Sequence, residues 1–188
     1  WDTVTAEKEK FRQRTFMGLS GKKKKIEFGD IKSYLEHARE KVEMGIERAF
    51  DAKKKLYPTY FENEVVQYRV LTKNQAGRVY VKPLRFKQTP LPFFIEGPVH
   101  ALKVETDPAK RKELLKAVRE SDLYDTKLEM YKVCAPLSGA SPEIGRARVF
   151  PPGWLENQTI WLHMEYKFLL ELLKSGMTEE FFRDFKKT

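Results

Sequence analysis

The sequence predicts a mainly α fold that is interrupted once, by a β-hairpin followed by an ordered loop. Apolar residues between 31 and 50 recur at the spacing of one helical face. Residues 158–174 are apolar on nearly all sides of a helix, and such a helix is buried on all faces. Within 65–81, β-branched and aromatic residues are typical of strands. A fully buried helix beside amphipathic ones indicates a layered helical body, such as an inner and an outer ring of helices.

The N-terminal part of the chain is expected to hold one short and one long helix. Residues 5–12 suit the short helix, and Gly18 and Gly21 break it. Asp30 begins the long helix, which ends before Pro58. Because its polar face is rich in charged residues, we expect its apolar face to pack on a core.

Residues 61–105 are expected to form the hairpin and the loop insertion. The hairpin turn falls at residues 74–77, Asn-Gln-Ala-Gly. Closely spaced prolines then prevent a continuous helix or a central strand: Pro83, Pro90, Pro92 and Pro98. Because apolar residues lie between these prolines, we expect a long ordered loop packed on a larger body, and long loops in compact domains are often functional.

Signals for helix starts and stops place the remaining elements. An Asp-Pro pair at 107–108 begins a helix. Residues 121–131 are expected to form a short helix or a turn. Asn157 suits the N-cap of the buried helix 158–174, and an acidic helix follows from Thr178.

The composition excludes several classes of protein. The chain has 188 residues, of which 41% are hydrophobic and 13% aromatic, too many for a disordered chain. No apolar stretch approaches the roughly 18 residues of a membrane span. The single cysteine, Cys134, excludes an internal disulfide framework and favours a reducing, cytoplasmic compartment.

The charge and the first residue bear on partners and on chain boundaries. The formal charge is +9, yet Lys and Arg are scattered and often neighbour Glu. We therefore expect most of these charges to lie on the solvated surface, and we disfavour nucleic acid as a partner. Residues 22–25, four lysines, are expected to be a solvated loop, with a phosphate-backbone contact as the alternative. Because the chain begins with Trp1 and not with Met, we expect residues 1–188 to be one segment of a larger polypeptide.

Four residues around the start of the buried helix form a candidate sugar-phosphate site. Trp154 suits stacking on a sugar ring, and Glu156 and Asn157 suit its hydroxyl groups. His163 suits an anion near the N-terminus of the helix. Each has a plainer interpretation: Asn157 as a cap, Glu156 as a residue favoured by the helix dipole, and the other two as core residues.

These residues belong to a motif that resembles one of the cellobiose and chitobiose phosphorylases, glycoside hydrolase family 94. It reads Pro152-Gly153-x-x-Glu156-Asn157-x-x-Ile160-x-x-His163. The similarity extends from residue 145 to residue 185. The chain departs from the family at Leu155, where the family has Lys, and at Gln158 and Thr159, where the family often has Gly. Since contacts to the acceptor sugar select the substrate, the identity of the sugar is not specified.

The resemblance implies part of an (α/α)6 barrel that cleaves a β-linked disaccharide with inorganic phosphate as co-substrate and inverts the anomeric carbon. It implies no metal and no other cofactor. The substrate-binding residues would be Trp154, Glu156 and Asn157. The phosphate-binding residues would be His163, Arg146 and Arg148.

Ionised phosphate needs no general base, so one carboxylic acid that protonates the leaving oxygen suffices. The family's acid is an Asp in an Asp-Trp-Asn-Asp motif, and Asp2, directly after Trp1, is its candidate here. Otherwise the chain lacks the acid and is inactive alone. Expected partners are the disaccharide and the rest of the polypeptide, with a homodimer left open. The alternatives are a non-catalytic carbohydrate-binding or scaffold fragment and a basic nucleic-acid-binding module.

Overall fold

The computed structural model describes residues 2–188, and these residues divide into two compact units. One unit ends at Met44, and the other runs from Gly45 to Thr188. Each unit is described by itself.

The first unit holds helix α1 (Asp2–Thr15) and most of helix α2 (Phe28–Ala49). Both helices were predicted, although α2 begins at Phe28 and Asp30 lies in its first turn instead of preceding it. The four lysines at 22–25 are exposed as expected. The prediction that α2 packs one side on a core is wrong, because all of its residues are exposed or half-buried. Tyr34, on the apolar face, is 71% exposed. Helical spacing identifies the face that burial would use, but it says nothing about whether another element covers that face.

The second unit begins with the end of α2 and continues into a two-stranded antiparallel ribbon, β1 (Phe61–Lys73) and β2 (Val79–Pro90). The predicted hairpin is confirmed. In its turn, the backbone N–H of Arg78 donates to Asn74 Oδ1 over 2.9 Å, and Gly77 has a φ of 74°. The prediction that a loop begins near Pro83 is wrong, because β2 continues to Pro90. Both strands of a two-stranded ribbon are edge strands, so a proline there need not interrupt a ladder of hydrogen bonds.

Helix α3 (Glu96–Val104) lies where the sequence predicts the end of the long loop. Pro98, Val99 and Leu102 are its buried residues. Gly97 allows the preceding chain to pass very close, since a Cβ there would lie 2.3 Å from the carbonyl oxygen of Tyr57. The prolines from which the sequence predicts a loop do not prevent this helix. Pro83, Pro90 and Pro92 precede α3, and Pro98 lies in its first turn, where proline is tolerated.

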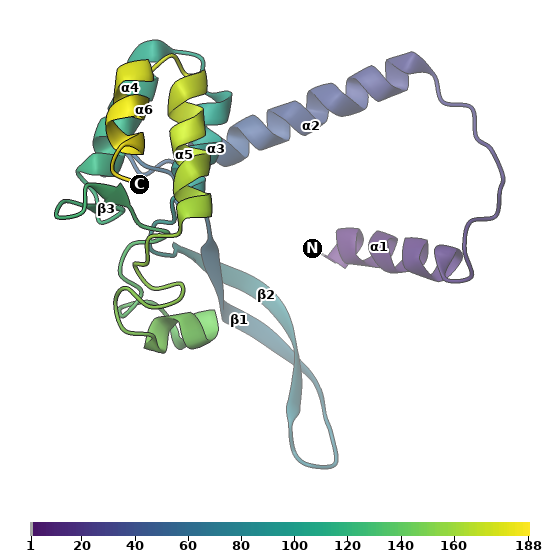
Figure 1. Ribbon diagram of the computed structural model, residues 1–188. Helices are drawn as coiled ribbons and strands as arrows, with labels where there is room; N and C mark the ends of the chain where they lie inside the picture. The colour runs from purple at the N-terminus through teal and green to yellow at the C-terminus, as the bar shows by residue number, and fades with distance from the viewer. Residues whose placement is uncertain (1) are drawn as a thin grey trace. The chain divides into compact units, whose positions relative to one another are not determined.

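The rest of the second unit consists of three α-helices, a small hairpin and a 3-10 segment (Figure 1). Asp107 caps α4 (Pro108–Arg119) as predicted, and its side chain accepts from the N–H of Ala109 over 2.8 Å. Residues 121–131 contain a hairpin of β3 (Tyr124–Asp125) and β4 (Met130–Tyr131). The remaining elements are the 3-10 segment η1 (Pro142–Val149) and helices α5 (Leu162–Lys174) and α6 (Thr178–Phe185).

The prediction of a mainly α fold forming part of an (α/α)6 barrel is wrong. Residues 2–188 are a mixture of 46% helix and 19% strand, with seven helices and two small antiparallel sheets. The barrel required a helix buried on every side, but α5 has one buried side, and α3 and α6 pack against it. Its opposite side is 38–45% exposed: Leu162, Tyr166, Leu170 and Leu173. One covering layer is therefore enough for α5, and no surrounding ring is needed.

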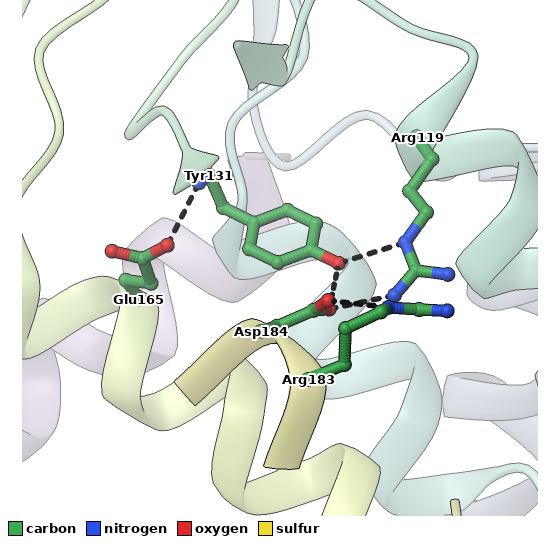
Figure 2. A network of polar contacts seen from close by, with 5 residues as sticks. All are labelled: Arg119, Tyr131, Glu165, Arg183 and Asp184. Carbon is green, nitrogen blue, oxygen red and sulfur yellow. Dashed lines mark hydrogen bonds and ion pairs between the residues drawn. The ribbon is translucent and has the colours of Figure 1, made fainter. Parts of the chain in front are cut away.

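A buried polar network joins α4, β4, α5 and α6 (Figure 2). The hydroxyl of Tyr131 donates to Asp184 Oδ2 over 2.6 Å, and Arg119 donates to the same oxygen over 2.6 Å and to the Tyr131 hydroxyl over 3.1 Å. Arg183 donates to the other oxygen of Asp184 over 3.2 Å. On the backbone side, the N–H of Tyr131 donates to Glu165 Oε1 over 2.9 Å. The short helix α6 is thus held by directional bonds as well as by apolar contacts.

Candidate functional site

The candidate site is the loop between η1 and α5, residues 150–161, which folds back on itself. The N–H of Gly153 donates to the carbonyl of Asn157 over 2.8 Å, and the N–H of Asn157 donates to the carbonyl of Trp154 over 3.1 Å. Leu155 lies between them with a φ of 48°, in the left-handed region. This tight turn presents Trp154 outward, 56% exposed.

Asn157 fixes the loop from inside. Its side chain is 2% exposed and makes two hydrogen bonds. Oδ1 accepts from the N–H of Leu137 over 3.2 Å, and Nδ2 donates to the carbonyl of Phe150 over 2.7 Å. The prediction that Asn157 caps the following helix is wrong, because α5 begins at Leu162 and Trp161 takes the N-cap position. The amide that was expected to serve the helix end instead joins two loops.

Cys134 holds the loop from the other side. Its buried thiol donates to the carbonyl of Glu156 over 2.8 Å and accepts from the N–H of Gln158 over 3.4 Å. Burial raises the pKa of the Cys134 thiol, so the sulfur keeps its proton and remains a donor at neutral pH. Sequence reasoning used this cysteine only as a marker of compartment, because nothing in its spacing indicates a contact 22 residues away.

Glu156 supplies the carboxylate of the site. Its Oε1 lies 3.7 Å from Nη2 of Arg146, an exposed ion pair. Its Oε2 is buried and has no hydrogen-bond partner among residues 2–188. The hydroxyl of Thr159 is buried and equally unpartnered within the part of the chain that the structure describes. Buried polar atoms are costly to leave unpaired, so a hydrogen-bond partner for either atom would stabilise the site.

An aromatic surface accompanies these polar atoms. The rings of Phe150 and Trp154 meet edge to face with centroids 5.2 Å apart. The guanidinium carbon of Arg146 lies 5.9 Å from the centroid of the Phe150 ring. Sequence reasoning did not single out Phe150, whose signal is one aromatic residue directly before the motif. An exposed indole and a carboxylate on this loop, with a guanidinium from η1 beside them, can bind the apolar face and the hydroxyl groups of a sugar ring.

The other predicted site residues lie elsewhere. His163 is in the first turn of α5 and is exposed, and its ring stacks on Trp161 with centroids 5.4 Å apart. Arg148 belongs to η1, and its Nε donates to the carbonyl of Ser138 over 3.4 Å. Asp2 is the first residue of α1, in the other compact unit. The structure therefore brings Trp154, Glu156, Asn157 and Arg146 together in and around one loop.

Two further findings concern metals and membranes. Within residues 2–188, His, Cys, Asp and Glu side chains do not gather in threes in a way that could hold a metal ion. Across the same range, none of the helices combines the length and the apolar content needed to cross a bilayer. Comparisons of the chain with known protein families, with curated proteins and with solved structures found no match.

Proposed function

We propose that the chain contributes sugar contacts to a carbohydrate-active enzyme resembling the inverting glycoside phosphorylases. In this proposal the loop around Trp154 binds the acceptor-side sugar of a β-linked disaccharide. One observation carries it: the unpartnered Oε2 of Glu156 lies in the same tight turn as the exposed Trp154. The pairing supplies a stacking surface and a hydrogen-bond acceptor, which are the two kinds of contact that a sugar ring uses.

The loop is well suited to orient a ligand because it is fixed before the ligand arrives. Asn157 and Cys134 bond the turn to the 134–137 segment, so binding a sugar requires little ordering of the backbone. Preorganised contacts retain more of their interaction energy for binding. Arg146 adds a positive charge beside Glu156 that limits repulsion of an incoming phosphate.

The proposed reaction transfers a glycosyl group from the disaccharide to phosphate. Phosphate attacks the anomeric carbon, the glycosidic C–O bond breaks, and an acid protonates the leaving oxygen. The product pair is a sugar 1-phosphate and a free sugar. His163 is the proposed phosphate contact, since it is exposed at the N-terminal end of α5, where the helix dipole favours an anion.

Two measurements on the chain test the proposal. Isothermal titration calorimetry with a panel of β-linked disaccharides should give saturable binding that Trp154→Ala abolishes. The matched control is Tyr34→Ala, which removes an aromatic side chain that is 71% exposed in the other unit. The second measurement is formation of sugar 1-phosphate from the same sugars and inorganic phosphate, which His163→Ala should weaken through a higher KM for phosphate.

Sugar binding without sugar 1-phosphate is expected of the chain alone if it lacks the acid. The same result with the full polypeptide would support the alternative of a non-catalytic carbohydrate-binding protein. Absence of both binding and turnover would contradict the proposal altogether. Equal losses from Trp154→Ala and Tyr34→Ala would also contradict it, because a general loss of folding would then explain the result.

A further inference from the structure

The ribbon formed by β1 and β2 carries a group of exposed basic side chains in the second unit. The ribbon, residues 61–90, has two acidic side chains near its base, Glu62 and Glu64, and Lys87 is directly opposite Glu64. Beyond them it contains only basic charges: Arg69, Lys73, Arg78, Lys82 and Arg85. Several basic residues elsewhere pair with nearby carboxylates, as Lys10 does with Glu7 and Arg39 with Glu43. Figure 1 shows the ribbon extending away from the helices of its own unit, with the turn at its far end.

The register of the ribbon places part of this charge on one face. Arg69 is directly opposite Lys82, and Gln67 is directly opposite Arg85. Residues 67 and 69 of β1 are two positions apart, and the register shift between Gln67 and Tyr68 brings Arg85 and Lys82 opposite them although these two are three positions apart on β2. The two pairs place Arg69 and Arg85 next to Gln67, and a ligand of opposite charge would complement the two arginines.

The other face of the ribbon is apolar and holds the strands together. Val70 is opposite Val81, and Tyr68 is opposite Pro83. Along β1 these pairs alternate with those of Gln67 and Arg69, and on β2 a register shift beside Gln67 accommodates one extra residue, Leu84. The ribbon is thus amphipathic, with Gln67, Arg69 and Arg85 presented together on its polar face.

We infer that this ribbon is a nucleic-acid-binding arm whose basic face enters the major groove of duplex DNA. Charge complementarity points to a polyanion, and the shape points to the duplex. Two strands lie about 5 Å apart, and the major groove of B-DNA, roughly 12 Å wide, admits a two-stranded ribbon. Arginine and glutamine are also the side chains that read guanine and adenine edges there, whereas lysines at the margins meet phosphates.

Binding of a fluorescently labelled DNA duplex, measured by anisotropy at several salt concentrations, tests the inference. The chain should bind at low salt, with an affinity that falls steeply as salt rises. The double variant Arg69→Gln/Arg85→Gln should weaken binding by about tenfold or more, because it removes two base contacts and two positive charges. Both side chains are exposed, so the fold should be retained, and circular dichroism checks this.

The matched control is Lys110→Gln/Lys112→Gln, which removes the same formal charge from exposed positions on α4. It should leave binding nearly unchanged. Loss of equal size in the two double variants would overturn the inference, since only net charge would then matter. Trp154→Ala should not affect DNA binding, so failure here is distinguishable from failure of the proposed sugar site.

Three other ligands are measured in parallel. Duplex RNA should bind more weakly, because its deep and narrow major groove does not admit the ribbon. Single-stranded DNA and vesicles of anionic lipid should also bind more weakly than duplex DNA. Equal or tighter binding of any of them, or no DNA binding at low salt, would overturn the assignment of duplex DNA as the ligand.

Discussion

Replacing Tyr131 with Phe removes the single hydroxyl at the centre of the buried network and leaves the ring in place. The ring is 1% exposed and contacts Phe168 with centroids 4.6 Å apart, so the apolar packing should survive. The hydroxyl donates to Asp184 over 2.6 Å and accepts from Arg119 over 3.1 Å. Burial, together with the bond to Asp184, raises the pKa of Tyr131, so the group is a neutral donor at all working pH values.

The expected loss in free energy of unfolding is about 2 kcal/mol, since hydrogen bonds to charged groups contribute about 1.5–3 kcal/mol. Asp184 keeps its bonds to Arg119 and Arg183, which limits the loss. The Arg119 side chain is 25% exposed, so water can replace the acceptor that it loses.

Urea unfolding measures this loss as a lower midpoint at unchanged m-value. Tyr166→Phe is the matched control, because Tyr166 is 43% exposed on α5. Substitutions at exposed positions usually change the free energy of unfolding by no more than about 0.5 kcal/mol. If Tyr131→Phe lowers the free energy of unfolding no more than Tyr166→Phe does, the network does not anchor α6.

Two more variants probe the buried polar groups. Burial raises the pKa of Glu165 above its ordinary value, so the folded state favours the protonated side chain. The free energy of unfolding that this protonation contributes is fully present below the ordinary Glu pKa. It is lost as the pH rises through the raised pKa of the folded state. Glu165→Gln should therefore be more stable than the parent at pH 7 and lose that advantage at pH 4, as urea midpoints at the two pH values would record; the same difference at both pH values would contradict this. Asn157→Ala should cost about 2–3 kcal/mol, because the backbone groups of Leu137 and Phe150 each lose a buried partner. The exposed Asn63→Ala is its control, and equal urea midpoints for the two variants would contradict the role of Asn157.

Local signals in the sequence predict several elements well. The Asp-Pro pair at 107–108, the Asn-Gln-Ala-Gly turn at 74–77 and the spacing of α2 all identify structure that is present. These signals depend on interactions within a few residues, such as the cap made by Asp107. Burial was harder to predict: α2 has an apolar face that is not buried, and α5 has only one buried side. Burial depends on segments far away in the chain, which no local pattern encodes.

The candidate site illustrates the same division. Its motif places Trp154, Glu156 and Asn157 in one short stretch, and the structure keeps them together. The supporting contacts come from Cys134 and Leu137, which are 20 or more residues away. The sequence predicts Asn157 as a cap because a short polar side chain before a helix usually has that role. Here the chain continues for four residues before α5 begins, so the amide bonds to a distant loop.

The two proposed binding elements differ in how firmly they are held, and the difference matches their proposed ligands. The loop around Trp154 is joined to the core at Cys134 and Asn157, so its groups keep fixed positions. A small ligand makes few contacts, so the loss of one contact through a misplaced protein group removes a large share of its binding energy. Fixed positions therefore matter most for such a ligand. The ribbon is held mainly at its base, where the hydroxyl of Tyr60 donates to Glu96 over 2.6 Å and the ring of Tyr60 meets Phe94. Isolated two-stranded hairpins are only marginally stable, and a compliant arm can follow a groove and form many weak ionic contacts along it.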